Sequence, residues 1–216
     1  RIIRRIELPE PKVSMEAVKF LLNPIVLLAR TTHSSVVNLQ SVAETLQRLL
    51  LDMLRNYTDE ELKLDVANNA KSVVGLLESL CLATSVSEET RQVFPHFRRE
   101  FSLKCLLSPF LIKRLEGMAM INEFVRNARD AEELVRSSSF GDKDGQQVSA
   151  GEGSLAIWLK QVKIMEILYG PTMHLEVLKR SADVVKYLLH AGQLSVNDVL
   201  MMWDATIGKH ETIRCR

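Results

Sequence analysis

Apolar residues recur every three or four positions along most of the chain, which is the spacing of one face of an α-helix. The clearest stretch covers residues 36–54, where the apolar positions are Leu39, Val42, Leu46, Leu49 and Met53. An alternation of apolar and polar residues, which would indicate a strand, never persists. The pattern therefore predicts an all-α protein.

Capping residues and helix breakers divide this pattern into segments. We expect Thr58 and Glu61 to form a capping box that opens a helix reaching residue 83, and Ser85 and Glu88 to open the next helix. Pro95 should kink or split that second helix, because proline has no backbone N–H to donate. The later periodic stretches predict further helices at residues 111–125, 154–169, 172–190 and 195–203.

Residues 137–154 differ in composition from the rest of the chain, because serine and glycine dominate and apolar side chains are few. Such a segment buries too little surface to order itself, so we predict a flexible loop that a nonspecific protease cuts first. The loop would separate a helical repeat segment at residues 1–136 from its continuation at residues 155–216. The sequence also starts without Met, and we expect it to be a piece of a longer protein.

Successive helices with wide apolar stripes need neighbours that cover those stripes. Stacked antiparallel pairs provide such cover, and candidate pairs begin near residues 34, 87 and 154, at irregular spacing. We therefore predict an irregular armadillo/HEAT-like stack of antiparallel helix pairs. A compact helical bundle is the alternative arrangement.

The amino-acid composition limits the classes of partner that this chain is expected to bind. The 28 Lys and Arg residues almost balance the 27 Asp and Glu residues, so the basic surplus typical of a nucleic-acid binder is absent. No apolar run reaches the length of a membrane span, and we expect neither nucleic acid nor membrane as a partner. The 3 cysteines are scattered and odd in number, which favours a reducing compartment, the cytoplasm with access to the nucleus.

The residues that most often carry chemistry do not form a convincing site. Cys81 and Cys105 lie within apolar helical patterns, so we interpret both as buried structural thiols. The 5 histidines lack zinc-ligand spacing, and residues 142–145 match only part of a calcium loop. We therefore expect no cofactor and no metal.

Two further groups of residues have a structural and a functional interpretation. The small basic clusters at residues 98–104 and 113–114 are interpreted as solvated helix faces, with a patch for an acidic partner as the alternative. Trp158 and Trp203 lie on apolar stripes, so we expect both to pack in the core.

Two stretches carry a family resemblance. Residues 101–121 contain Phe-Ser-Leu-Lys-Cys-Leu-Leu and Lys-Arg-Leu-Glu-Gly-Met, and residues 158–211 contain His-Leu-Glu-Val-Leu-Lys-Arg-Ser, a later Trp and Gly-Lys-His-Glu. Over residues 100–216 the chain resembles the non-catalytic helical region of the giant ubiquitin-specific proteases of the fat-facets (FAF-X) type, which are ubiquitin carboxyl-terminal hydrolases of the peptidase C19 family. That family cleaves the bond after the C-terminus of ubiquitin with a Cys–His–Asp/Asn site. Its Cys and His boxes are absent here, so the resemblance assigns no catalytic residue to this chain.

The resemblance implies a helical scaffold segment of a cysteine-type deubiquitinase. Such a segment would bind protein partners or ubiquitinated substrates and position a catalytic domain that lies outside this chain. His174, Glu176, Lys179 and Arg180 are candidates for lining a partner-binding groove between stacked helices, whereas a simple intrahelical pair of Glu176 with Arg180 is the structural alternative. A helical-repeat adaptor with no attached enzyme is the first rival function, and a helical enzyme with an unrecognised site in this chain is the second.

Overall fold

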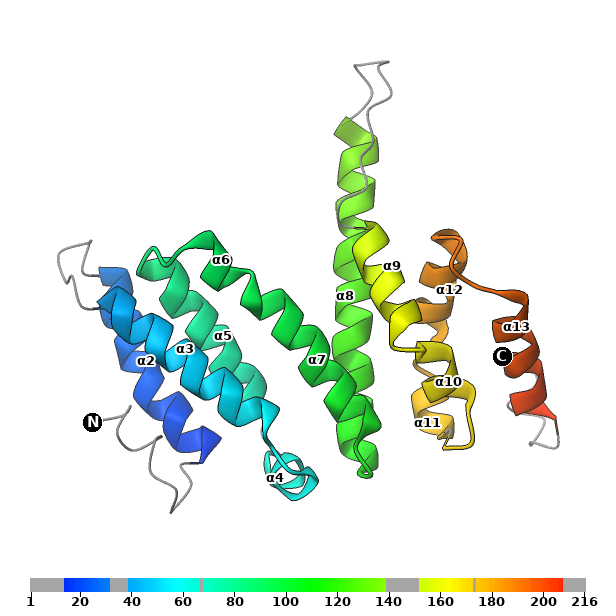
Figure 1. Ribbon diagram of the computed structural model, residues 1–216, viewed down its shortest axis with the longest axis horizontal. Helices are drawn as coiled ribbons and strands as arrows, with labels where there is room; N and C mark the ends of the chain where they lie inside the picture. The colour runs from blue at the N-terminus through cyan, green and yellow to red at the C-terminus, as the bar shows by residue number, and fades with distance from the viewer. Residues whose placement is uncertain (1–13, 32–38, 67, 139–151, 173, 208–216) are drawn as a thin grey trace. The chain divides into compact units, whose positions relative to one another are not determined.

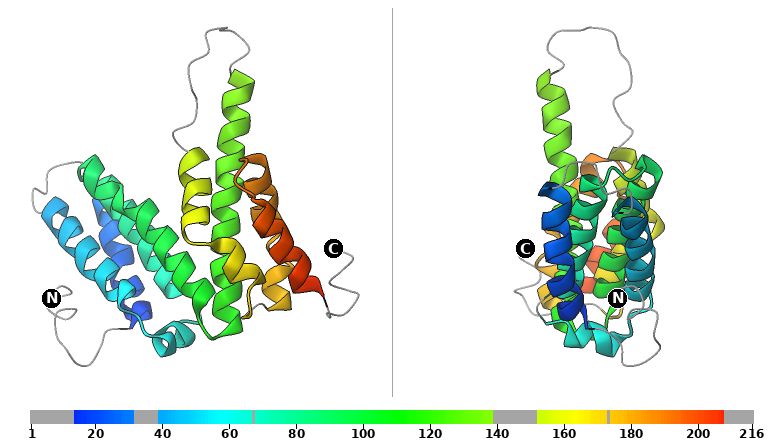
Figure 2. Two further views of the ribbon diagram at one scale, coloured as in Figure 1. Left: turned by 45° about the vertical axis from the view of Figure 1, so that its right-hand side comes forward. Right: turned by 90° about the vertical axis from the view of Figure 1, so that its left-hand side faces the viewer.

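The computed structural model describes residues 14–31, 39–66, 68–138, 152–172 and 174–207 (Figures 1 and 2). Every regular element within these ranges is a helix, and no strand occurs in them. The predicted all-α class is therefore confirmed. The chain divides into two compact units, residues Arg1–Lys113 and Arg114–Arg216, and each is described by itself.

The first unit is built around a central helix. Its helices are α2 (Met15–Thr31), α3 (Leu39–Arg55), α4 (Asp59–Leu64), α5 (Asn69–Ala83), α6 (Glu88–Arg91) and α7 (Val93–Leu107). α2 and α3 both pack against α5, and α3 also contacts α7 (Figure 1). Val18, Leu50 and Leu77 are among the fully buried side chains, so α2, α3 and α5 share one hydrophobic core.

The buried face of α3 differs from the predicted stripe. Of the five apolar positions expected to face the core, only Leu46 is fully buried, and the four others are half-buried. The buried residues are instead Ala43, Leu46, Gln47, Leu50, Leu51 and Leu54. Three consecutive leucines occupy residues 49–51, so the apolar spacing fits two different faces of this helix. The contacts of α3 with α5 and α7 determine which of the two faces is buried.

The single helix expected from residue 59 to residue 83 is two helices, which corrects that prediction. Its start is right, because Thr58 and Glu61 form the predicted capping box of α4. The chain then leaves the helix after Leu64, and Asn68 before α5 adopts a left-handed conformation with φ 52°. Asp65 causes the break, because its Oδ1 and Oδ2 accept hydrogen bonds from the backbone N–H groups of Asn69 and Ala70, at 2.8 and 2.9 Å. Val66, expected on the buried stripe, is therefore 76% exposed.

The next helix start was also predicted two residues too early. Ser87, not Ser85, caps α6 by accepting a hydrogen bond from the backbone N–H of Thr90 at 3.3 Å. The helix does split, as predicted, but at Gln92. Pro95 lies in the first turn of α7, where its missing N–H costs no intrahelical bond.

The second unit contains most of α8 (Leu111–Ser138) and all of the later helices. These are α9 (Glu152–Gln161), α10 (Ile164–Tyr169), α11 (Leu175–Leu178), α12 (Ala182–His190) and α13 (Val196–Thr206). α8 contributes Met118, Ile121 and Val125 to the core, as its predicted stripe requires. The helices reach Ser138 and resume at Glu152, so most of the predicted loop, residues 139–151, lies outside the described residues.

Two long helices expected in this unit are each broken once. The stretch 154–169 divides into α9 and α10, because Lys163 takes a left-handed conformation with φ 54°. The stretch 172–190 divides into α11 and α12 at residues 179–181. α10 ends at Gly170, as predicted. Because these helices are short, the chain changes direction several times within this unit. As a result, α10 lies against α9, α11 and α13.

Candidate functional site

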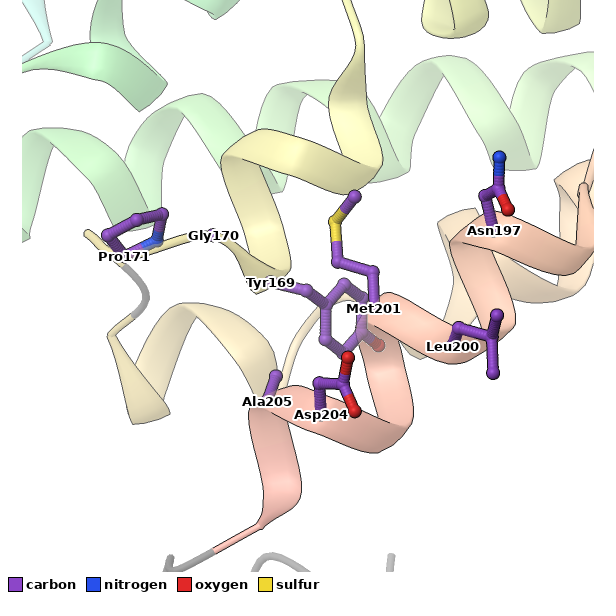
Figure 3. A pocket seen from close by; sticks show the side chains of 8 residues that line it. All are labelled: Tyr169, Gly170, Pro171, Asn197, Leu200, Met201, Asp204 and Ala205. Atoms are coloured by element: carbon purple, nitrogen blue, oxygen red, sulfur yellow. The ribbon is translucent and has the colours of Figure 1, made fainter.

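A cavity of about 570 Å³ lies between the end of α10 and one side of α13 (Figure 3). Apolar side chains form most of its wall, while one carboxylate and one amide are polar exceptions. The lining residues are Tyr169, Gly170, Pro171, Asn197, Leu200, Met201, Asp204 and Ala205. The size and the mixture of apolar walls with few polar groups are typical of a site that receives a side chain or a short peptide segment.

Gly170 shapes one wall of this cavity. A Cβ atom at this position would lie 2.2 Å from the backbone oxygen of Glu166, a separation that no real structure tolerates without movement of the backbone. Glycine therefore allows the chain to leave α10 abruptly, and Pro171 follows it directly and cannot continue the helix. The short Gly-Pro turn leaves the ring of Tyr169 facing α13 (Figure 3).

α13 is held in place by a capping box at its first turn. Ser195 Oγ accepts from the backbone N–H of Asp198 at 3.2 Å, and Asp198 Oδ2 accepts from the backbone N–H of Ser195 at 2.7 Å. Lys160 of α9 joins this box, because its Nζ donates to Asp198 Oδ2 at 2.9 Å and to the Gln193 carbonyl at 3.0 Å. The predicted start of this helix at residue 195 is confirmed.

The charge of Asp198 is stabilised by these contacts. Burial alone would raise the pKa of its carboxyl group, but the hydrogen bonds from Ser195 and Lys160 outweigh burial and lower the pKa below its ordinary value. The Asp198 carboxylate therefore stays ionised and keeps its hydrogen-bond donors within the capping box. Asp204, two turns later on the same helix, is exposed at the rim of the cavity and gives this rim an acidic group.

The four residues predicted to line a groove lie around α11, and none of them lines this cavity. His174 Nδ1 accepts from the backbone N–H of Glu176 at 3.2 Å, which makes His174 the N-cap of α11. Glu176 pairs with Lys179, whose Nζ lies 2.6 Å from Oε1, and this hydrogen bond lowers the pKa of Glu176. The backbone carbonyl of Arg180 accepts from Asn122 Nδ2 of α8 at 2.8 Å. These contacts give the four residues local structural roles, and their part in partner binding stays a prediction.

The two cysteines of the described part of the chain are both buried, as predicted. Burial raises the pKa of Cys81 to about 11, and the nearby carboxylates of Glu44 and Glu78 act in the same direction. A thiol with so high a pKa is a poor nucleophile at neutral pH. Among the residues that the structure describes, no group of three or more His, Cys, Asp or Glu side chains could hold a metal ion.

None of the helices in the described ranges combines the length and the apolar character that crossing a bilayer requires.

Three cations of the basic clusters make contacts within the first unit, and the burial of Lys113 corrects its interpretation as part of a solvated helix face. Arg98 forms an ion pair with Glu78 of α5, and Lys104 Nζ donates to the backbone carbonyl of Arg55 at the end of α3. Lys113 is only 3% exposed, and its Nζ donates to the Asp65 carbonyl at 2.6 Å. These cations satisfy carbonyl and carboxylate oxygens near helix ends, an arrangement that sequence spacing alone cannot reveal.

The two tryptophans have different environments. Trp158 on α9 is half-buried, whereas Trp203 on α13 is 68% exposed, so the prediction that Trp203 packs in the core is wrong. The residues that form the cavity were also missed. Their signal lies in α13, where apolar residues occur on two opposite faces of one helix.

Comparison with known proteins finds partial similarity to several ubiquitin carboxyl-terminal hydrolases. Ubiquitin carboxyl-terminal hydrolase puf of Drosophila melanogaster is 29% identical over 112 residues, which are 50% of this chain and 3% of that protein. Ubiquitin carboxyl-terminal hydrolase 34 of Homo sapiens is 27% identical over 158 residues, 71% of this chain and 4% of that protein. The Probable ubiquitin carboxyl-terminal hydrolase FAF of Drosophila melanogaster is 21% identical over 171 residues, 76% of this chain and 6% of that protein.

The chain thus spans only 3 to 6% of the length of these relatives, and it is similar to one region of each. No protein-family model matches the chain. No solved structure matches it either.

Proposed function

We propose that this chain is a non-catalytic helical scaffold segment of a longer cysteine-type deubiquitinase of the fat-facets type. It binds protein partners or ubiquitinated substrates and positions a catalytic domain that lies outside residues 1–216. In this proposal the helices of each unit pair in an irregular armadillo/HEAT-like manner, and the protein works in the cytoplasm with access to the nucleus.

The observation that carries the proposal is the pattern of similarity. The ubiquitin carboxyl-terminal hydrolases described above, from an insect and from a mammal, match 50 to 76% of this chain, yet the matched region is only 3 to 6% of their own length. A region that recurs within much larger hydrolases and consists of helices is suited to architecture and binding. The buried thiols of Cys81 and Cys105 support the same conclusion, because neither is placed to attack a peptide bond.

The cavity between α10 and α13 supports the binding part of the proposal. Its walls of Tyr169, Leu200 and Met201 suit an apolar anchor, and Asp204 at the rim suits a lysine or arginine next to that anchor. Aromatic and methionine side chains are enriched where proteins bind one another. A partner segment with one large apolar residue and a neighbouring basic residue fits this chemistry.

The activity assay that tests the proposal compares the 216-residue chain with the longer protein from the same coding sequence. Both are incubated with ubiquitin that carries a fluorogenic amide at its C-terminus and with ubiquitin that carries a cysteine-directed electrophile. We expect the longer protein to release the fluorophore and to form the covalent adduct, and the 216-residue chain to do neither.

Two results would contradict the proposal. Turnover by the 216-residue chain that disappears in Cys81→Ser or Cys105→Ser would place catalysis within this chain. A coding sequence without a cysteine protease domain would remove the deubiquitinase and leave the helical-repeat adaptor.

A further inference from the structure

α13 carries apolar residues on two opposite faces. On the inner side, toward α10, Met201 and Ala205 are partly buried and line the cavity. The opposite side bears an outer stripe at spacings of three and four residues, in which every side chain is at least half exposed. The outer stripe of α13 consists of Val196, Val199, Leu200, Trp203 and Ile207.

A single exposed apolar side chain is ordinary on a protein surface, but a complete helical stripe is not. The exposed fractions are 76% for Val196 and 68% for Trp203, so the stripe includes a large aromatic residue that is mostly exposed. A helix that is apolar on both sides is typical of a position between two layers of protein. Among the helices that the structure describes, α10 packs against the inner side of α13, whereas the side chains of the outer stripe stay at least half exposed.

α2, the first helix that the structure describes, repeats the pattern independently. Its inner face places Val18, Leu22 and Val26 in the core, whereas Phe20 on the other side is 80% exposed. Leu27 and Leu28 are exposed on that same outer side. Exposed apolar side chains thus occupy one side of a helix in each of the two units.

The occupant of the outer stripe follows from these faces together with the length of the relatives. The matched ubiquitin carboxyl-terminal hydrolases continue far beyond the matched region, which is 3 to 6% of their length. We propose that the outer stripe of α13 is a junction that docks an amphipathic helix from the same polypeptide outside residues 1–216. The inference rests on the proposed function in one respect, namely that the chain is part of a longer protein.

The chemistry of the docking helix is set by the residues beside the stripe. Asn197 and Asp204 lie along one edge of the outer stripe, and both are exposed. The docking helix should present apolar residues at helical spacing to Val199 and Trp203, with a lysine or arginine opposite Asp204. The same contact would close one side of the cavity between α10 and α13, since Leu200 belongs to both surfaces.

Trp203 is a built-in reporter for this contact. The chain has 2 tryptophans, so Trp158→Phe leaves Trp203 as the single indole. The experiment compares this variant of residues 1–216 with the same variant lengthened by the helices that follow in its coding sequence. We expect the emission of Trp203 to move to shorter wavelength in the lengthened chain, and its quenching by acrylamide to fall several-fold.

A matched pair of substitutions in the lengthened chain tests whether the stripe itself makes the contact. Val199→Asp lies on the stripe and should restore the quenching seen in residues 1–216. Leu189→Asp changes an equally exposed apolar residue of α12 outside the stripe and should leave Trp203 protected. Circular dichroism of both variants verifies that helix content is kept.

Water-exposed emission of Trp203 in the lengthened chain would overturn the inference. Equal effects of Val199→Asp and Leu189→Asp would overturn it as well. Protection that rises with protein concentration in residues 1–216, and that the added helices do not increase, would assign the stripe to a second copy instead. The absence of a protease domain from the coding sequence would refute the proposed function and leave this docking result unaffected.

Discussion

Asp65 offers the sharpest test of how this chain divides its helices. The side chain stands between α4 and α5, and each of its carboxylate oxygens accepts one backbone N–H at the start of α5, at 2.8 and 2.9 Å. α5 is the helix against which α2 and α3 pack, so its first turn supports the core of the first unit. Asp65→Ala removes both acceptors and leaves two N–H donors without a protein partner.

The magnitude of this loss follows from the two bonds. Loss of a capping side chain costs about 0.5–2 kcal/mol, and hydrogen bonds to a charged acceptor lie toward the upper end of the usual range. Because Asp65 is half-buried and water can reach part of the site, we expect Asp65→Ala to reduce the free energy of unfolding by about 2 kcal/mol. Asp65→Asn keeps one acceptor oxygen and should lose about 1 kcal/mol.

The assay is urea denaturation followed by circular dichroism, combined with amide hydrogen exchange at Asn69 and Ala70. Glu60→Ala is the control, since Glu60 is exposed and has only a 3.9 Å contact with Lys63, and its cost should stay within about 0.5 kcal/mol. Exchange at the two amides should accelerate in Asp65→Ala and not in the control. If Asp65→Ala and Glu60→Ala lose the same free energy, Asp65 does not cap α5 and the explanation of the break is wrong.

Five further predictions each concern one residue. Gly75→Ala should raise the free energy of unfolding by about 0.5–1 kcal/mol, because the added Cβ would meet nothing within 4 Å. Gly170→Ala should lower the free energy of unfolding by about 1–3 kcal/mol, because the added Cβ would collide with the Glu166 carbonyl. Thermal denaturation of the two variants checks both directions. Ser195→Ala should cost about 1 kcal/mol, seen as faster amide exchange in the first turn of α13, whereas unchanged exchange would rule out the cap. The lowered pKa of Asp198 means that its carboxylate stabilises the fold above the ordinary aspartate value of 3.8 and that this contribution is lost as the pH falls through the lower, folded-state pKa; Asp198→Asn should therefore reduce stability at neutral pH and have little effect well below that pKa. With a pKa of about 11, roughly one Cys81 thiol in a thousand is ionised at pH 8, so iodoacetamide should label Cys81 only after denaturation, and rapid labelling of the native chain would contradict its burial.

The helical class follows from the sequence because a spacing of three and four residues has one structural meaning over long stretches. The predicted capping box at Thr58 and the predicted helix start at residue 195 were right, since both signals are local and involve residues three positions apart. The breaks at Asp65 and Lys163 were missed. Apolar periodicity continues across both, while a carboxylate bound to N–H groups four and five residues ahead, or a left-handed lysine, ends the helix.

The candidate site was harder to predict than the fold. His174, Glu176 and Lys179 were candidates because they are polar residues in the stretch that resembles the protease family. In the structure they form hydrogen bonds with one another around α11. The cavity instead depends on a turn at Gly170 and on the approach of α13 to α10, which are tertiary features. Trp203 was placed in the core because an apolar stripe does not reveal whether the layer that covers it lies within the same 216 residues.

We propose above that this chain binds substrates and positions them for a catalytic domain elsewhere in a longer deubiquitinase. Steady-state kinetics of the longer protein with Asp204→Lys tests it most directly, with Asp130→Lys, a charge reversal at an exposed position of α8 outside the cavity, as the control. We predict that Asp204→Lys raises KM for a ubiquitinated protein substrate several-fold and leaves cleavage of a fluorogenic ubiquitin amide unchanged, while the control alters neither. Equal kinetics of Asp204→Lys and the control on both substrates would contradict the claim.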